Sequence, residues 1–235
     1  MGSCLDEDPE PPEEEPGQGL GPSSAAAARR SGTYGRERHI ASSVLRWVRH
    51  HLQCPIVSSR HLAHVAVVHA LTVLSTRVKE LLPHVHDVWP ALLPSFEVVA
   101  PLAVQADACI LLKHTARLSG DFIRQRFATD CWPGLWAQLR SAEAVAQAEA
   151  AAWSPALRAQ LAALDALAFL AGDAAVISSM TEELVAVGLK FLAAGTAERL
   201  RDKAWALMRA LATTDPDLVW LYARSATAPG GCDGG

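Results

Sequence analysis

The chain has 235 residues, of which 50% are hydrophobic and only 6% aromatic. This length can hold one large domain or a stack of small units, and the apolar content allows a sizeable core. The formal net charge of −4 lacks the basic surplus typical of nucleic-acid-binding domains. Alanine and leucine dominate and β-branched runs are few, which favours helices over strands.

The cysteines and the first residues carry no strong disulfide or targeting signal. The five cysteines are scattered, form no CxxC pair and follow no secretory signal, which is typical of reduced thiols. The start, Met-Gly-Ser-Cys, is similar to an acylation signal, but Asp6 stands where serine or threonine is required. The longest apolar runs contain charged residues such as Asp107, Lys113 and Asp165, so we expect a soluble protein without a membrane span.

Residues 1–38 are predicted to be a disordered leader. Acidic residues alternate with prolines up to Glu15, and a stretch rich in Gly, Ser and Ala follows, ending in arginines up to Arg38. Such a composition buries too little apolar surface to offset the entropy lost on ordering. A short acidic docking segment is the alternative. The Gly-rich end, residues 225–235, is also predicted to be disordered.

Helices are expected after the leader. The first ends at Cys54-Pro55, because the residue before a proline avoids the α region. Ser58 or Ser59 is expected to cap a second helix that continues to about Leu82, with Pro83 at its end. The apolar stripe predicted for the first helix consists of Ile40, Val44, Trp47, Val48 and Leu52.

The stretch from Leu81 to Gly120 predicts two amphipathic helices joined by a turn. Pro101 lies where the second helix starts, since its missing N–H costs nothing there. Gly120 is expected to cap the C-terminal end. The two apolar stripes are Leu81, Leu82, Val85, Val88, Trp89, Leu92 and Leu93, then Val104, Ala108, Leu111, Leu112 and Leu118. Such a pair cannot bury both apolar faces alone, so further pairs are expected on either side.

Similar helices follow to the C-terminal end. A short helix is expected over residues 121–130 and another from Asp130, and Ser154-Pro155, Asp173 and Asp215-Pro216 have the residue types that start helices. The expected helix pairs are 39–82, 83–120, 121–172 and 173–213, with a terminal helix after them. This layout predicts an all-α fold, an α-solenoid of about four HEAT-like helical hairpins over residues 39–224. A closed helical bundle is the alternative.

The sequence contains none of the common motifs of enzymes or metal sites. His61, His64 and His69 share one predicted helix, but no carboxylate or cysteine stands at ligand spacing. Cys109 lies on an apolar helix face and is expected in the core. The chain is therefore predicted to be non-enzymatic, without metal or cofactor. A catalytic site in which His64, His69 or Asp107 meet at a deep pocket is the alternative.

The seven tryptophans and a basic cluster are further candidates for function. Four tryptophans lie on apolar stripes and are expected in the core: Trp47, Trp89, Trp136 and Trp205. The others lie near helix ends, where an exposed indole can serve as a partner-binding anchor: Trp132, Trp153 and Trp220. The basic residues Arg46, Arg49, His50 and Arg60 leave nucleic-acid binding open as another alternative.

Three segments between Leu81 and Tyr222 together resemble one protein family. They are LLPHVHDVWPALL, APLAVQADACILLKHTARLSGDFIRQRFATDCWPGL and TTDPDLVWLY, in this order. They are similar to the C-terminal HEAT-repeat region of the Tel-two-interacting protein one family, the scaffold subunit of the triple-T (TTT) co-chaperone complex. The chain is far shorter than full-length members of that family, and its acidic leader and Gly-rich end do not match.

The resemblance implies a scaffold that supports chaperone-assisted maturation and stability of phosphatidylinositol-3-kinase-related kinases through protein–protein contacts. It implies Tel-two-like and Tti-two-like helical-repeat partners, the kinases and chaperone machinery through the complex, no nucleic acid or membrane, and a cytoplasmic and nuclear location. Candidate partner-binding residues in the matching segments are Arg124, Arg126, Trp132, Asp215, Asp217 and Trp220. A generic HEAT-repeat adaptor in transport or another assembly is the alternative. An apolar patch on residues 39–80 would indicate a surface that stacks on preceding repeats.

Overall fold

The computed structural model describes residues 23–76, 78–140 and 154–227. The chain divides into two units, residues 1–36 and 37–235, and helix α1 (Ser23–Val48) contains the division. This helix begins inside the predicted leader, because the alanines and arginines that follow Ser24 are strong helix formers. Residues 1–22 and 228–235 lie outside the described residues, so the division into leader, solenoid and tail stays a prediction.

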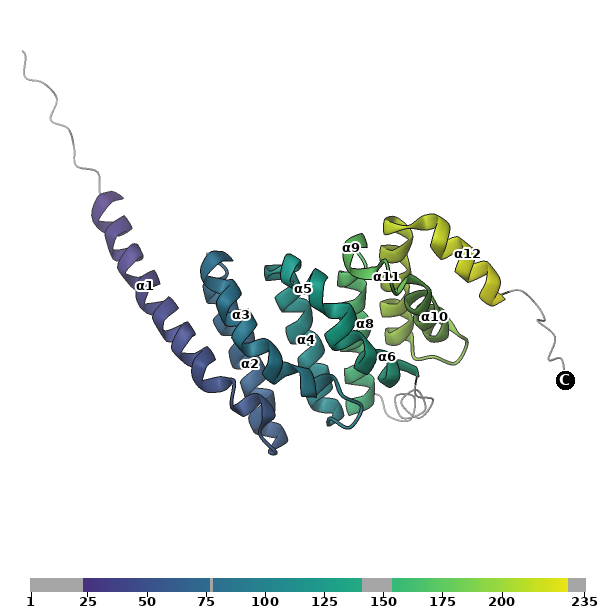
Figure 1. The fold of residues 1–235 in the computed structure, drawn as a ribbon, viewed down its shortest axis with the longest axis horizontal. Coiled ribbons are helices and arrows are strands. Elements are labelled where there is room, and N and C mark those ends of the chain that lie inside the picture. Colours follow the sequence, from purple (N-terminus) through teal and green to yellow (C-terminus); the bar gives the residue numbers. More distant parts are fainter. Residues whose placement is uncertain (1–22, 77, 141–153, 228–235) are drawn as a thin grey trace, which may run out of the picture. The chain divides into compact units, whose positions relative to one another are not determined.

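The unit from residue 37 is a series of helical hairpins (Figure 1). After α1 come η1 (His51–Gln53), α2 (Val57–Leu74), α3 (Val78–Leu92), η2 (Leu93–Phe96), α4 (Leu102–Leu118), α5 (Gly120–Arg126), the π-helical turn η3 (Phe127–Cys131), α6 (Trp132–Arg140), α8 (Pro155–Leu170), α9 (Ala174–Ile177), α10 (Thr181–Leu192), α11 (Glu198–Thr214) and α12 (Pro216–Thr227). The predicted all-α solenoid is confirmed, with hairpins α1–α2, α3–α4, α5/α6–α8 and α10–α11 and the terminal helix α12.

These helices form two layers. The second helices of the hairpins, α2, α4, α8 and α11, pack side by side in chain order. The other layer contains α3, the segment α5–α6, α9, α10 and α12, connected by contacts of η2 with η3, of α5 with α9 and of α10 with α12. Figure 1 shows α2 and α11 at opposite ends of their row, so the row is open and the closed-bundle alternative is wrong.

An apolar core runs along the hairpins. Its largest fully buried side chains include Leu71, Leu81, Trp89, Phe96, Leu112, Phe127 and Phe191. These come from successive hairpins and belong to one continuous cluster of buried residues. Each hairpin therefore buries its apolar sides against its neighbours, as repeat architectures require. None of the described helices is both long enough and apolar enough to cross a membrane.

Several helix boundaries follow from local capping, as predicted. The side chain of Ser154 accepts a hydrogen bond from the backbone N–H of Leu157 at 3.1 Å at the start of α8. Asp173 and Asp215 accept bonds of the same kind before α9 and α12. Gly195, with φ of +95°, separates α10 from α11 in a left-handed conformation that favours glycine.

Other predicted boundaries are wrong. The helix expected to reach Leu82 ends at Leu74, where the Ser75 hydroxyl donates to the carbonyl of Thr72 at 2.7 Å and satisfies a terminal acceptor. Helix α3 then passes through Pro83 instead of starting after it. Gly120 opens α5 and does not cap α4, because the chain turns one residue earlier. The helices expected on either side of Asp130 are joined by the π-helical turn η3.

Candidate interaction surfaces

The first hairpin exposes several large apolar side chains. Ile40 and Trp47 on α1 are 61% and 66% exposed, and Leu62 on α2 is 67% exposed. Val65 and Val73 are exposed further along α2 at helical spacing. Leu62, Val65 and Val73 lie on the side of α2 opposite its buried residues, which are Ala63, His64, Val67, Ala70, Leu71 and Leu74. We call Ile40, Trp47, Leu62, Val65 and Val73 the N-terminal end face; no described part of the chain covers it.

The end face corrects part of the sequence prediction. Helix α1 buries Ala41, Leu45 and Val48 and turns Ile40 and Trp47 outward. Both sets of residues have helical spacing, and contact with the neighbouring helices decides which of them is buried. Several large apolar side chains are therefore exposed between residues 40 and 73, and their union in one continuous patch stays a prediction.

The tryptophans differ in exposure in a way that their sequence positions did not predict. Trp89 is 1% exposed, as expected, and Trp136 is half-buried. Trp205 on α11 is 56% exposed, so its assignment to the core, like that of Trp47, is wrong. Trp220 on α12 is 61% exposed, and the guanidinium of Arg224 lies 5.1 Å from its ring centroid. Trp153 lies outside the described residues.

Two of the candidate partner-binding residues connect elements within the chain. A guanidinium N–H of Arg124 donates to Asp121 at 2.6 Å, and its Nε donates to Asp173 at 2.7 Å and so links α5 to the residue that caps α9. Trp132 is only 6% exposed, and its indole N–H donates to Glu183 of α10. These contacts hold neighbouring hairpins together, so at least Trp132 is a core residue in this structure.

The remaining candidates lie on two separate surfaces. The guanidinium of Arg126 lies 4.8 Å from the ring centroid of Phe122. Asp215 accepts the backbone N–H of Leu218 at 3.1 Å and caps α12, while Asp217 and Trp220 are exposed on that helix. The structure therefore does not gather the six candidates into one site, and partner binding by them stays a prediction.

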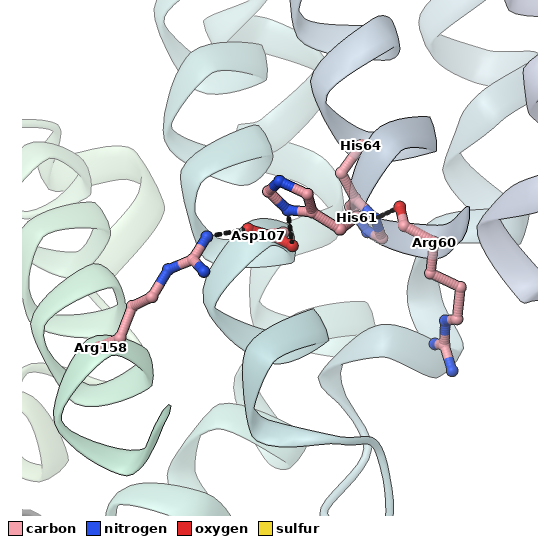
Figure 2. A network of polar contacts seen from close by, with 5 residues as sticks. All are labelled: Arg60, His61, His64, Asp107 and Arg158. Carbon is pink, nitrogen blue, oxygen red and sulfur yellow. Dashed lines mark hydrogen bonds and ion pairs between the residues drawn. The ribbon is translucent and has the colours of Figure 1, made fainter. Parts of the chain in front are cut away.

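A buried carboxylate links three hairpins (Figure 2). Asp107 of α4 is 4% exposed and accepts hydrogen bonds from Nδ1 of His61 on α2 at 2.6 Å and from Arg158 on α8 at 2.5 Å. Next to it, Nδ1 of the buried His64 donates to the carbonyl of Arg60 at 2.7 Å. Burial lowers the pKa of His64, which favours the neutral imidazole.

A second carboxylate repeats this arrangement one hairpin further along. Asp165 of α8 accepts hydrogen bonds from Lys113 of α4 and Lys203 of α11. Burial raises the pKa of Asp165, but the hydrogen bonds from the two lysines outweigh it and lower the pKa overall. We call Asp107 and Asp165 with their basic partners the aspartate ladder, since it connects α2, α4, α8 and α11 in a row.

Sequence reasoning missed the aspartate ladder because its partners are distant in sequence. Asp107 is separated from His61 by 46 positions and from Arg158 by 51. No local motif links residues this far apart. The available signal was that Asp107, Lys113 and Asp165 interrupt apolar runs, and a charge on a buried helix face needs a partner.

The proposed alternative catalytic site does not form in the described structure. Asp107 contacts His61 and Arg158, while His69 is exposed on the outer side of α2. Among the described residues, no group of three or more His, Cys, Asp or Glu side chains could hold a metal ion. Cys109 is fully buried, as expected, and burial raises the pKa of its thiol to about 12.

Two of the cavities between described helices contain no residue of that alternative site. The first, of about 180 Å³, lies between α1 and α3 and is lined by Ser42, Leu45, Arg46, Arg49, His84, Asp87 and Val88. The second, of about 150 Å³, lies between α8 and α11 at the starts of these two helices. Arg60 of the predicted basic cluster donates to Ser95 at 3.1 Å, whereas Arg46 and Arg49 line the first cavity, so these arginines serve different contacts.

Comparison with known proteins identifies relatives of this chain. The profile of the family described as "TTI1 C-terminal TPR domain" matches residues 6–220. The "TELO2-interacting protein 1 homolog" of Mus musculus is 28% identical over 159 residues, which cover 67% of this chain and 15% of the relative. The Homo sapiens protein of the same name is 27% identical over 161 residues, covering 68% and 15%. The match thus spans about 15% of the length of these relatives.

No solved structure matches the chain significantly. The family description names TPR repeats where the sequence predicts HEAT-like ones. Both repeat types are pairs of helices that stack into an α-solenoid, so the architecture in Figure 1 agrees with either name. The family profile also matches residues that precede Leu81, where the segments that carry the sequence resemblance begin.

Proposed function

Because the chain belongs to the family of the TTI1 C-terminal TPR domain, we propose that it is a non-enzymatic scaffold that binds other helical-repeat proteins in a TTT-like co-chaperone complex. The curated relatives are named for interaction with TELO2. The corresponding proposal for this chain is binding to Tel-two-like and Tti-two-like subunits. The assembly would support maturation and stability of phosphatidylinositol-3-kinase-related kinases in the cytoplasm and nucleus.

The N-terminal end face is the observation that carries this proposal. Within the array, α4 and α8 are covered on both sides by the neighbouring helices of their row, whereas α2 contacts only α4 in that row. The surface of α2 that is not covered by other helices exposes Leu62, and α1 exposes Trp47. Burying a large apolar side chain stabilises a complex by about 1.5–3 kcal/mol, or roughly tenfold or more in Kd. A helical hairpin of a partner is the kind of surface that these side chains fit, because helices of repeat proteins pack through apolar side chains.

The test is binding of a purified Tti-two-like subunit to the full chain, measured by calorimetry. The double variant Trp47→Ala/Leu62→Glu should weaken binding at least about tenfold, because both changed side chains are exposed anchors. Trp205→Ala is the matched control, since it removes a tryptophan of comparable exposure from the last hairpin and should leave the affinity within about twofold. Circular dichroism confirms that both variants fold.

Two outcomes would contradict the proposal. A folded chain that shows no association with Tti-two-like or Tel-two-like subunits is not a scaffold of this complex. An affinity that is unchanged in Trp47→Ala/Leu62→Glu would show that the N-terminal end face is not the contact. Binding of an unrelated helical-repeat protein through this face, in the absence of Tti-two-like binding, would favour the generic adaptor.

A further inference from the structure

The first cavity combines two arginines with a serine and a histidine. It lies between the C-terminal part of α1 and the middle of α3, and all of its lining residues belong to the unit from residue 37. Leu45 and Val88 of the lining are buried, and its other members are polar. The volume of about 180 Å³ is below the ~300 Å³ at which small-molecule sites begin, and it equals roughly six water molecules at ~30 Å³ each. The cavity is therefore suited to one compact polar group of a larger ligand.

Arg46 and Arg49 are placed to share such a group. The backbone N–H of Arg49 donates to the carbonyl of Leu45 at 3.2 Å, so the helical spacing of α1 extends to Arg49 and places Ser42 on the same side. Within the described part of the chain, the side chain of Arg46 has no hydrogen bond or ion pair, and that of Arg49 contacts only His50, at 3.4 Å. The negative end of the α1 dipole favours basic residues here, but it does not account for their position around a cavity.

The serine and the histidine add hydrogen-bonding groups from both helices. Oγ of Ser42 on α1 lies 3.1 Å from Nε2 of His84 on α3. When Nε2 carries the proton and donates to Ser42, the hydroxyl is free to donate to a ligand. Among the described residues, His84 has no carboxylate partner, so the pair lacks the third member of a catalytic triad and is suited to binding.

The charges around the cavity select among anions. Arg46 and Arg49 face one carboxylate of the lining, Asp87, which forms no ion pair with any described residue. The other charged residues between residue 37 and the end of α3 cancel in charge: Glu37 with Arg38, and Lys79 with Glu80. Asp87 repels any anion, so a ligand with a single negative charge gains little. A phosphate monoester carries about −1.5 to −2 charges and three strong acceptor oxygens, and it therefore fits this set of groups.

We propose that the cavity between α1 and α3 binds the phosphate group of a phosphorylated serine or threonine on a partner protein. The phosphate oxygens accept hydrogen bonds from the guanidinium groups of Arg46 and Arg49 and from the hydroxyl of Ser42. Nucleic acid is disfavoured, because each of its phosphodiesters carries one charge and its binding needs basic residues along a strand. The inference rests on the proposed scaffold function and adds a contact that depends on phosphorylation of the partner.

The experiment measures capture of the full chain by an immobilised peptide library in which one phosphoserine is flanked by randomised residues. The best-binding sequence is then labelled with a fluorophore, and its Kd is measured by fluorescence anisotropy. A twin with unmodified serine should bind at least about tenfold more weakly, because it lacks the charge. A twin with glutamate in place of the phosphoserine should bind at least about fivefold more weakly, because it carries a single charge.

Arg46→Gln/Arg49→Gln is the decisive variant, and it should weaken binding of the phosphopeptide about tenfold or more. Arg201→Gln/Arg209→Gln is its matched control, because it removes the same charge from two exposed positions of α11 in the last hairpin. The control should bind within about twofold of the original chain. Asp87→Asn should strengthen binding at least about twofold, because it removes the carboxylate that repels the phosphate. Circular dichroism confirms that the variants fold.

The inference is overturned if no peptide of the library captures the chain, if the serine twin binds as tightly as the phosphopeptide, or if the two double arginine variants behave alike. Weaker binding in Asp87→Asn would also overturn it. A uridine oligonucleotide that binds through Arg46 and Arg49 more tightly than the phosphopeptide would assign the cavity to nucleic acid instead. Inorganic phosphate that binds as tightly as the phosphopeptide would assign it to the free ion.

A parallel measurement separates this inference from the scaffold proposal. An unphosphorylated Tti-two-like subunit should bind Arg46→Gln/Arg49→Gln as tightly as the original chain, because the N-terminal end face is unchanged in that variant. Loss of phosphopeptide binding with intact subunit binding is therefore the expected result. A chain that binds the phosphopeptide but not the subunit would contradict the scaffold proposal alone.

Discussion

Replacing Asp107 by asparagine tests whether the aspartate ladder stabilises the array. The variant keeps the shape of the side chain and creates no cavity, but it removes the charge that His61 and Arg158 share. We expect Asp107→Asn to lower the free energy of unfolding much more than Asp165→Asn does. Both changes affect a carboxylate with two basic partners on the same layer, so burial is the main difference between them.

The expected magnitudes follow from the exposure of the groups. A hydrogen bond to a charged group contributes about 1.5–3 kcal/mol, and Asp107, at 4% exposure, accepts two of them. The side chains of His61 and Arg158 are 43% and 50% exposed and regain water when the carboxylate is lost, which reduces the net effect to about 2 kcal/mol. Asp165 is 32% exposed and its lysines 38% and 41%, so its loss should be about 0.5 kcal/mol.

The assay is urea unfolding at pH 7, followed by far-UV circular dichroism and tryptophan fluorescence, at about 0.15 M and 1 M sodium chloride. The small effect of Asp165→Asn should disappear at high salt, because exposed pairs are screened. The larger effect of Asp107→Asn should persist, because the carboxylate is shielded from the solvent.

Equal effects of the two substitutions would refute this reasoning, since they would show that burial does not decide the strength of the contact. A stability gain in Asp107→Asn would refute it as well. That result would mean that desolvation of the carboxylate outweighs its hydrogen bonds in the native chain.

The remaining predictions concern packing, thiol reactivity and pH. Gly134→Ala should destabilise the chain by about 2 kcal/mol in urea unfolding, because the new Cβ would lie 2.3 Å from the backbone oxygen of Phe96, which cannot move aside freely. Iodoacetamide should modify the half-exposed Cys54 in the native protein but not Cys109, whose burial raises its pKa to about 12; peptide mass spectrometry gives the order. Burial lowers the pKa of His64, so this histidine binds a proton more readily in the unfolded chain than in the folded one. Its contribution to the unfolding free energy is therefore complete above about pH 6.5 and is lost as the pH falls. His64→Gln should flatten the decrease in unfolding free energy between about pH 7 and 5.

A matched variant or a contradicting outcome checks each of these three predictions. Gly188→Ala places a Cβ 2.4 Å from Sδ of Met208, the flexible part of a side chain, and should therefore destabilise less than Gly134→Ala; the opposite order would contradict the packing argument. His39→Gln, on the exposed part of α1, should leave the pH dependence unchanged. Modification of Cys109 as fast as Cys54 without denaturant would show that its surroundings open readily.

Local chemistry in the sequence was sufficient to predict the helical hairpins. Ser154, Asp173 and Asp215 cap helices with hydrogen bonds to nearby backbone N–H groups, and Gly195 adopts a left-handed conformation between two helices. These interactions act over a few residues, so the sequence alone contains them. The stripes around Trp89 were also recognisable, because the spacing of apolar residues on that helix allows only one buried side.

Contacts between distant segments decided the surfaces. Trp47 and Trp205 have the same helical spacing as core residues and are nevertheless more than half exposed, because each lies at an end of the array where no described helix covers it. Asp107 meets His61 and Arg158 only when three hairpins stack. Burial and pairing of charges depend on which helices become neighbours, and that information resides in the packing of the whole array and not in any local segment.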